Sequence, residues 1–209
     1  SDKRGLIDFA RGLRDLGVEI ISTGGTARAL REGGIPILEI DAFTGFPEML
    51  DGRVKTLHPR VHAGILYRRA DPAHVKTMEE HGLQPIDLLA VNLYPFEETV
   101  ARSGVTREEA IEQIDIGGPS MVRSAAKNHA DVTVVCSPDR YGDVLDEMRR
   151  NGGATTPALR RRLALEAFRR TATYDAAISA YLGSEEPGGG ALPERFHLAL
   201  DRAAELRYG

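Results

Sequence analysis

The sequence is poor in the residues and segments that build several common kinds of site. Its 209 residues include a single cysteine, Cys136, so no disulfide can form within the chain and cysteine alone cannot supply a zinc site. No apolar run approaches the roughly 20 residues that a membrane helix needs, and the opening SDKRGLIDFA lacks the hydrophobic segment of a signal peptide. We therefore expect no membrane partner and a reducing, cytoplasmic location.

Runs of positive charge are also missing. The formal net charge is -4, and no stretch is rich in Lys and Arg, so we expect no nucleic-acid partner. Against this background the segment Thr44–Ile65 stands out, because it gathers five basic residues: Arg53, Lys55, His58, Arg60 and His62. A local positive field that opposes the net charge suits an anionic small molecule.

Thr44–Ile65 is predicted to be one long loop, since it is rich in Gly, Pro and charge. Connections in compact domains have a median of about five residues, and a much longer one usually has a function. A solvated charged loop would carry the same cations. His58 and His62 have an i, i+4 spacing, but Pro59 between them argues against a helix and no third ligand is suitably spaced, so we predict no metal site.

The rest of the chain alternates short apolar segments with amphipathic ones. We predict strands at residues 18–21, 37–40, 86–92 and 132–136, and helices at 5–17, 26–32, 72–81, 107–113, 119–128, 138–151 and 156–182. Nearly continuous apolar strands between helices favour a parallel sheet covered on both faces, which is an α/β fold. The run EEPGGGALP, residues 185–193, is predicted to be a flexible break.

A Gly-rich turn, Ser22-Thr23-Gly24-Gly25-Thr26, falls between a predicted strand and a predicted helix. Such a turn directs backbone N–H groups and a helix N-terminus at an anion, and its hydroxyls add further donors, so a phosphate is the expected ligand group. An ordinary tight turn, with Thr as the N-cap and Gly at positive φ, would use the same residues.

Two further segments combine polar and apolar residues in ways that suit a site. Tyr94 follows the predicted strand 86–92 at its carboxyl end, where open α/β sheets bind ligands, although an amphipathic residue at the rim would have the same spacing. Asp115 precedes Gly-Gly-Pro, and the helix is predicted to begin at Pro119. That Asp is either a functional carboxylate or a group that stabilises the helix N-terminus.

Several long motifs together resemble a known family. The motifs FPEMLDGRVKTLHPRVHAGIL, VNLYPF, EQIDIGGPSMVRSAAKNHADVTVV and STGGTARAL are similar to those of the IMP cyclohydrolase half of bifunctional purine biosynthesis proteins. The resemblance implies a methylglyoxal-synthase-like α/β three-layer sandwich with a mostly parallel sheet and additional C-terminal helices. It also implies a homodimer that needs no cofactor and converts 5-formamidoimidazole-4-carboxamide ribonucleotide (FAICAR) to IMP with loss of water, the last step of de novo purine biosynthesis.

The same resemblance assigns roles to individual residues. The catalytic residues it implies are Lys55, Tyr94, Asp115 and Lys127. The substrate-binding residues it implies are Lys3, Thr23, Gly24, Gly25, Thr26, Arg53, Thr56, Asn92, Ile116 and Gly117. Where the family commonly has Thr after SDK this chain has Arg4, so an altered phosphate contact is expected.

The resemblance also sets expected boundaries. Residues 1–183 would form the cyclohydrolase domain with its helical extension, and 184–209 a linker and the start of an AICAR transformylase half, as expected for a piece of a longer bifunctional protein. Two rival functions remain: a nucleotide-binding regulatory module without catalysis, and a lyase acting on a triose phosphate.

Overall fold

The structure, a computed structural model, describes residues 2–94, 96–184, 196–200 and 203–204. The chain divides into two compact units, and the first combines residues 1–94 with 115–170. Residues 95–114 and 171–209 belong to the second unit. The predicted break at 185–193 lies outside the described residues.

The strands of the first unit are short and form two parallel pairs. In one pair β1 (Ile21–Ser22) lies beside β2 (Leu38–Glu39). In the other β3 (Leu88–Ala90) lies beside β4 (Thr133–Val135), all of whose residues are buried. The predicted α/β class with parallel strands is therefore confirmed, although each strand is shorter than the apolar segment that predicted it.

The first two helices pack together through a small apolar cluster. Helix α1 (Leu6–Asp15) begins after Gly5, whose φ of 64° places it in the left-handed region that glycine adopts most easily. Helix α2 (Gly24–Glu32) follows β1 directly. Ala10 of α1 and Leu30 of α2 are buried together with Ile35, so the two helices share one part of the core.

The segment predicted as one long loop contains helical structure at both ends. It starts within α3 (Ile40–Thr44), and its last third belongs to α4 (Pro59–Leu66). The prediction that Pro59 argues against a helix is wrong, because proline is tolerated at the first helical position, where the N–H has no partner in the helix. His58 is the N-cap, and its Nδ1 accepts a hydrogen bond from the Arg60 N–H at 3.1 Å.

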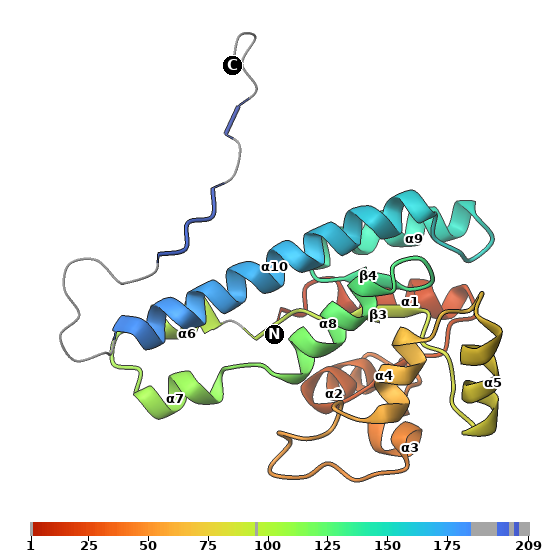
Figure 1. The fold of residues 1–209 in the computed structure, drawn as a ribbon, viewed down its shortest axis with the longest axis horizontal. Helices are drawn as coiled ribbons and strands as arrows, with labels where there is room; N and C mark the ends of the chain where they lie inside the picture. The colour runs from red at the N-terminus through yellow and green to blue at the C-terminus, as the bar shows by residue number, and fades with distance from the viewer. Residues whose placement is uncertain (1, 95, 185–195, 201–202, 205–209) are drawn as a thin grey trace. The chain divides into compact units, whose positions relative to one another are not determined.

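Helix α8 (Gly117–Lys127) is the central helix of the first unit and lies side by side with α4 (Figure 1). It begins two residues earlier than predicted, so Pro119 is its third residue rather than its first. Its buried face carries Val122, Ala125 and Ala126, which are at most 1% exposed. Through this face α8 packs against α4, β3 and β4.

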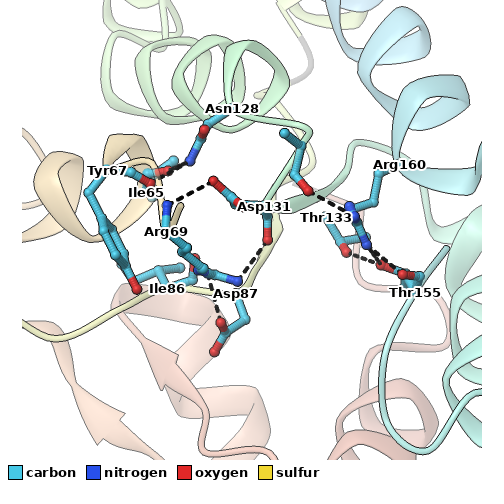
Figure 2. Close-up of polar contacts among 11 residues, drawn as sticks. Ile65, Tyr67, Arg69, Ile86, Asp87, Asn128, Asp131, Thr133, Thr155 and Arg160 are labelled. Atoms are coloured by element: carbon cyan, nitrogen blue, oxygen red, sulfur yellow. Dashed lines mark hydrogen bonds and ion pairs between the residues drawn. The ribbon is translucent and has the colours of Figure 1, made fainter. Parts of the chain in front are cut away.

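A polar network holds the C-terminal end of α8 (Figure 2). Asn128 donates from Nδ2 to the carbonyl oxygens of Ile65 and Tyr67, at 2.7 and 3.0 Å. Arg69 donates to the Asp131 carbonyl at 2.9 Å and forms an ion pair with Asp87 at 2.7 Å. These contacts join the segment after α8, the end of α4 and Asp87 just before β3.

The remaining helices complete the two units. Helix α5 (Pro72–Glu80), the 3-10 turn η1 (Pro138–Arg140) and α9 (Tyr141–Arg150) belong to the first unit, and α10 (Pro157–Ser184) contributes to both. The second unit contains α6 (Phe96–Val100) and α7 (Arg107–Glu112), and Phe96 makes edge contacts with Tyr174 and Tyr181. Among the described helices none is long and apolar enough to cross a membrane.

Candidate functional site

The Gly-rich turn forms the N-terminus of α2. Thr23 is extended and precedes the helix, and Gly24 begins it with a φ of 57°. The Thr23 side chain makes no capping hydrogen bond, so it satisfies none of the N–H groups in the first turn of the helix. Gly24 and Gly25 are exposed, which leaves these N–H groups and the positive end of the helix accessible to an anion.

Two lysine side chains reach this turn from different segments. The Lys3 Nζ lies 3.5 Å from the position that a Cβ would occupy on Gly25. On Gly24 the corresponding position is 3.9 Å from the Lys55 Nζ. Both separations are ordinary van der Waals distances, so the two ammonium groups lie beside the turn. Two ammonium groups over a helix N-terminus are a strong combination for binding a phosphate.

The loop that carries Lys55 has an unusual backbone. Leu50 and Asp51 both have a φ of 54°, and an antiparallel bridge between Met49 and Val54 closes the turn. Non-glycine residues in the left-handed region cost about 1–2 kcal/mol each, and such strain is often found at functional sites. Beyond this turn Lys55 is half-buried, and its Nζ lies 3.0 Å from the Glu48 Oε2.

The N-terminus of α8 adjoins the same loop. The Thr56 Oγ1 is 2.6 Å from the position that a Cβ would take on Gly117, so only glycine allows this contact. Asp115 lies just before the helix, and its Oδ1 accepts a hydrogen bond from the Gly118 N–H at 2.8 Å. The interpretation of Asp115 as a group that stabilises the helix N-terminus therefore describes one real contact of this carboxylate.

Burial raises the pKa of Asp115 above its ordinary value of 3.8, although hydrogen bonds from the N–H groups of Gly118 and Tyr94 act in the opposite direction. A carboxylate with a raised pKa is a better proton acceptor. The exposed side chains of Tyr94 and Ile116 flank it, at 44% and 59% exposure. An exposed aromatic ring and an exposed isoleucine beside a carboxylate suit a planar ligand with N–H groups.

The structure thus brings most of the predicted residues into one region of the first unit. We call this region the candidate site; it comprises Lys3, Thr23, Gly24, Gly25, Thr26, Lys55, Thr56, Tyr94, Asp115, Ile116 and Gly117. Arg53 is exposed on the same loop as Lys55. Asn92 is half-buried, and its Nδ2 donates to the Asp2 carbonyl and to the Tyr141 hydroxyl, at 2.8 and 3.2 Å.

Lys127 lies elsewhere. It is the last residue of α8, ten residues after Gly117, which places it about 15 Å away along the helix axis. There it lines a hollow of about 610 Å³ together with residues of α4, α8 and α10, among them Leu66, Arg123, Arg161, Leu165 and Phe168. None of the residues that line this hollow belongs to the candidate site. Lys127 is therefore the one catalytic residue implied by the resemblance that lies outside that site.

The structure also shows the contacts of Arg4 and of the two histidines in the basic segment. Arg4 forms ion pairs with Asp2 at 2.7 Å and with Asp139 at 3.7 Å. His62 is directed toward α8, where its Nδ1 lies 3.2 Å from the Ser124 Oγ, while His58 caps α4. Within the described part of the chain no group of three or more His, Cys, Asp or Glu residues is arranged to hold a metal ion.

Sequence reasoning missed three neighbours of the candidate site. Glu48 pairs with Lys55, and Asp2 and Tyr141 hold Asn92. Tyr141 is 49 residues from Asn92, and no pattern in the sequence links the two. Glu48 lies within the basic segment, so its proximity to the cations was a usable but overlooked signal.

Comparison with known proteins gives the class of this fold. The model of the MGS-like domain family matches residues 5–120, more than half of the chain. The chain belongs to the MGS-like domain family. The crystal structure of ForH is similar with a TM-score of 0.79 and 38% sequence identity, over 88% of this chain and 94% of that one.

More particular similarities follow. Residues 125–209 match the model of the AICARFT/IMPCHase bienzyme family. The bifunctional purine biosynthesis protein PurH of Rhodopirellula baltica is 57% identical over all 209 residues. The chain spans 40% of the length of that relative. The resemblance to bifunctional purine biosynthesis proteins that the motifs indicated is thereby confirmed.

Proposed function

We propose that this chain is an IMP cyclohydrolase, which closes the purine ring of FAICAR to give IMP and water. The observation that carries the proposal is the convergence of two lysines, a Gly-rich helix N-terminus and a carboxylate with a raised pKa in one region. The similarity to a protein named for purine biosynthesis, and to a family named for IMP cyclohydrolase, supports the same function.

The nucleotide would lie across the candidate site with its phosphate at the turn of α2. The Gly24 and Gly25 N–H groups, the Thr26 hydroxyl and the Lys3 ammonium would bind the phosphate oxygens. The imidazole ring with its two arms would then extend toward Asp115, between the exposed Tyr94 and Ile116. Arg53, Thr56, Asn92 and Gly117 border this path.

Ring closure needs a base. The carboxamide nitrogen attacks the formyl carbon, and an amide nitrogen is a poor nucleophile unless its proton is removed as the bond forms. Asp115 would accept this proton, because its raised pKa makes it a stronger base than an exposed carboxylate. Tyr94, whose backbone N–H bonds to Asp115 and whose side chain is 44% exposed, would relay a proton between Asp115 and the substrate.

Attack on the formyl carbon leaves negative charge on the formyl oxygen. Lys55 would stabilise this oxyanion and protonate it to a hydroxyl, and a preorganised donor of this kind contributes about 3 kcal/mol. The hydroxyl then leaves as water with the proton that Asp115 took up, while the formamido nitrogen gives its N–H proton to the Lys55 amine, so both groups return to their starting protonation states. Both reacting arms belong to one bound molecule, so orientation supplies much of the remaining acceleration. None of these steps calls for a metal or a redox cofactor.

The activity is tested by mixing the purified chain with FAICAR and following the absorbance of IMP. We expect turnover far above the uncatalysed rate. The rival regulatory module would bind IMP but leave the uncatalysed rate unchanged, and a triose phosphate lyase would act on dihydroxyacetone phosphate instead. Asp115→Asn and Lys55→Ala should each abolish most of the turnover while leaving the circular dichroism spectrum unchanged.

We further propose that the chain works as a homodimer in which Lys127 reaches the candidate site of the partner. Within one chain Lys127 is about 15 Å from Gly117 along α8, too far to share a reacting centre with Lys55. It borders exposed Leu66, Leu165 and Phe168, and apolar side chains gathered beside a hollow are typical of an interface. A second copy would bury these side chains and bring a second Lys127.

Complementation tests this arrangement. Lys55→Ala and Lys127→Ala should each be inactive alone, but mixed after denaturation and refolding they should regain up to roughly a quarter of the wild-type activity, since half of random dimers are mixed and each has one complete site. No regain would mean that both lysines act within one chain. Leu165→Asp should convert the dimer to a monomer in sedimentation measurements, whereas the exposed control Leu198→Asp should not.

The cytoplasmic location and the second activity are also proposals. De novo purine synthesis uses nucleotide substrates that are found in the cytoplasm. A chain with a single cysteine also fits a reducing compartment such as the cytoplasm. We propose that an AICAR transformylase activity belongs to the part of the PurH relative's length that this chain does not span.

A further inference from the structure

Tyr141 connects three elements next to the candidate site without belonging to it. It is the first residue of α9, and its ring stacks on Phe9 of α1 with the centroids 4.1 Å apart and the planes at 3°. The ring is buried, yet its hydroxyl oxygen lies 3.2 Å from the Nδ2 of Asn92, just beyond β3. A buried tyrosine usually finds a partner for its hydroxyl, and here that partner is another side chain.

The amide of Asn92 has only one orientation that fits its neighbours. Its Nδ2 is 2.8 Å from the Asp2 carbonyl oxygen, which can only accept a hydrogen bond, so the nitrogen rather than the oxygen must face Asp2. The second Nδ2 hydrogen points to the Tyr141 hydroxyl, which accepts it. Both donors of the amide are thus used: the Asp2 carbonyl selects this orientation, and Tyr141 is the second contact that holds the side chain in it.

The hydrogen bond from Asn92 to the Asp2 carbonyl also holds the backbone at Lys3. Asp2 immediately precedes Lys3, and the Lys3 carbonyl accepts a hydrogen bond from the Leu6 N–H at 3.2 Å as α1 begins. The peptide groups on both sides of Lys3 are therefore fixed, one by Asn92 and one by α1. Because the lysine side chain is long and flexible, the location of its ammonium group over Gly25 depends on this fixed backbone.

We propose that Tyr141 is a positioning residue: through Asn92 it holds the Asp2 carbonyl, and it thereby sets the Lys3 ammonium over the Gly24-Gly25 turn for binding the nucleotide phosphate. This inference rests on the proposed function, since it takes the ligand to be a nucleotide. Tyr141 itself touches neither the turn nor the reacting groups. Its effect belongs to ligand binding and leaves the chemical step unchanged.

The first test is Tyr141→Phe, which keeps the ring stacked on Phe9 and removes only the hydroxyl. We expect the KM for FAICAR and the Kd for IMP to rise roughly three- to tenfold, the effect of losing one neutral hydrogen bond, with kcat unchanged. The matched control is Tyr174→Phe, which removes another buried hydroxyl that bonds to the Gln113 carbonyl at 3.2 Å. That variant should lower Tm and leave KM and Kd as in the wild type.

A double-mutant cycle with Lys3→Ala tests the route of the effect. If Tyr141 acts through Lys3, adding Tyr141→Phe to Lys3→Ala should change the Kd for IMP no further. Additive losses, a fall in kcat rather than a rise in KM, or wild-type Kd in Tyr141→Phe would each overturn the inference.

Direct binding separates this inference from the proposed function. A wild-type chain that binds IMP or inorganic phosphate without converting FAICAR would refute the enzyme, while the Kd cycle would still decide the role of Tyr141. A wild-type chain that binds neither IMP nor inorganic phosphate would overturn both.

Discussion

The Lys55 ammonium forms a 3.0 Å ion pair with the Glu48 carboxylate, seven residues earlier in the same loop. Glu48 is half exposed, whereas only 23% of the Lys55 side chain is exposed. The carboxylate therefore occupies a place beside the lysine that a ligand anion would also favour. The carboxylate stabilises the ammonium near the turn, and a bound phosphate or oxyanion would have to compete with it.

Glu48→Gln should consequently strengthen anion binding. Removing the competing carboxylate should lower the Kd for IMP by roughly two- to fivefold, because an exposed ion pair contributes about 0.2–1 kcal/mol. Isothermal calorimetry at low salt measures this change. The control is Glu80→Gln, which removes an exposed pair with Lys76 at 3.5 Å on α5 and should leave the Kd as it was. Weaker binding by Glu48→Gln would mean that Glu48 orients Lys55 for the ligand.

Asp115→Asn should separate activity from stability. Because folding raises the pKa of this carboxyl, the folded chain holds the proton more tightly, and ionisation costs stability as the pH rises from about 3.8 through the raised pKa. The amide has no such cost, and its oxygen can still accept the Gly118 N–H. We expect the variant at pH 7 to have a Tm equal to or above the wild type while its kcat falls at least roughly a hundredfold.

The pH dependence of the wild type provides the second half of this test. Since the base must be ionised, kcat/KM should fall as the pH drops through the raised pKa of Asp115. A profile that stays flat down to the ordinary carboxyl range, or a marked loss of Tm in Asp115→Asn, would contradict this assignment.

Local patterns predicted the elements of the fold well where one residue type decides the backbone. The buried segment around Val134 and the helix that contains Val122 appear where the sequence placed them, and α2 follows the Gly-rich turn as predicted but begins two residues earlier, at Gly24. The start of α4 was missed because a proline was taken to end a helix, when at the first position it begins one.

The sequence predicted which residues form the candidate site better than it predicted how those residues are arranged in space. Motif resemblance placed Lys127 in one site with Lys55 and Asp115. In the structure Lys127 is twelve positions after Asp115, and nearly all of that stretch is helical. The rise of about 1.5 Å per helical residue already argued against their meeting in one chain. Lys55 pairs with Glu48 across a turn in which Leu50 and Asp51 are left-handed, a conformation that leucine rarely adopts and that the sequence therefore did not indicate.

His62 should make the protein sensitive to acid. Burial lowers the pKa of this imidazole, so the folded chain binds the proton less tightly than the unfolded one. The Ser124 hydroxyl donates to the Ser120 carbonyl at 2.8 Å, so its oxygen is available to accept from the His62 Nδ1–H. Its stabilising contribution is present above about pH 6.5 and is lost as the pH falls through the lowered pKa.

Tm measured from pH 7.5 to pH 5 checks this expectation. His62→Gln should flatten the decline, because glutamine can donate to Ser124 without titrating, whereas the exposed control His81→Gln should retain the wild-type slope. A parallel decline in all three proteins would show that other groups control acid stability.

Asn128→Ala should destabilise the chain through the end of α8. The Asn128 side chain is buried and donates to two carbonyl oxygens, those of Ile65 and Tyr67, which would be left without this donor. Loss of a buried donor that satisfies backbone acceptors costs about 1–3 kcal/mol, which urea unfolding measures. Asn151→Ala is the matched control, because that exposed Asn donates to the Glu147 carbonyl at 2.7 Å and should cost about 0.5 kcal/mol. Equal losses in the two variants would mean that burial of Asn128 adds nothing, and that the network at the end of α8 does not fix the helix that connects Gly117 with Lys127.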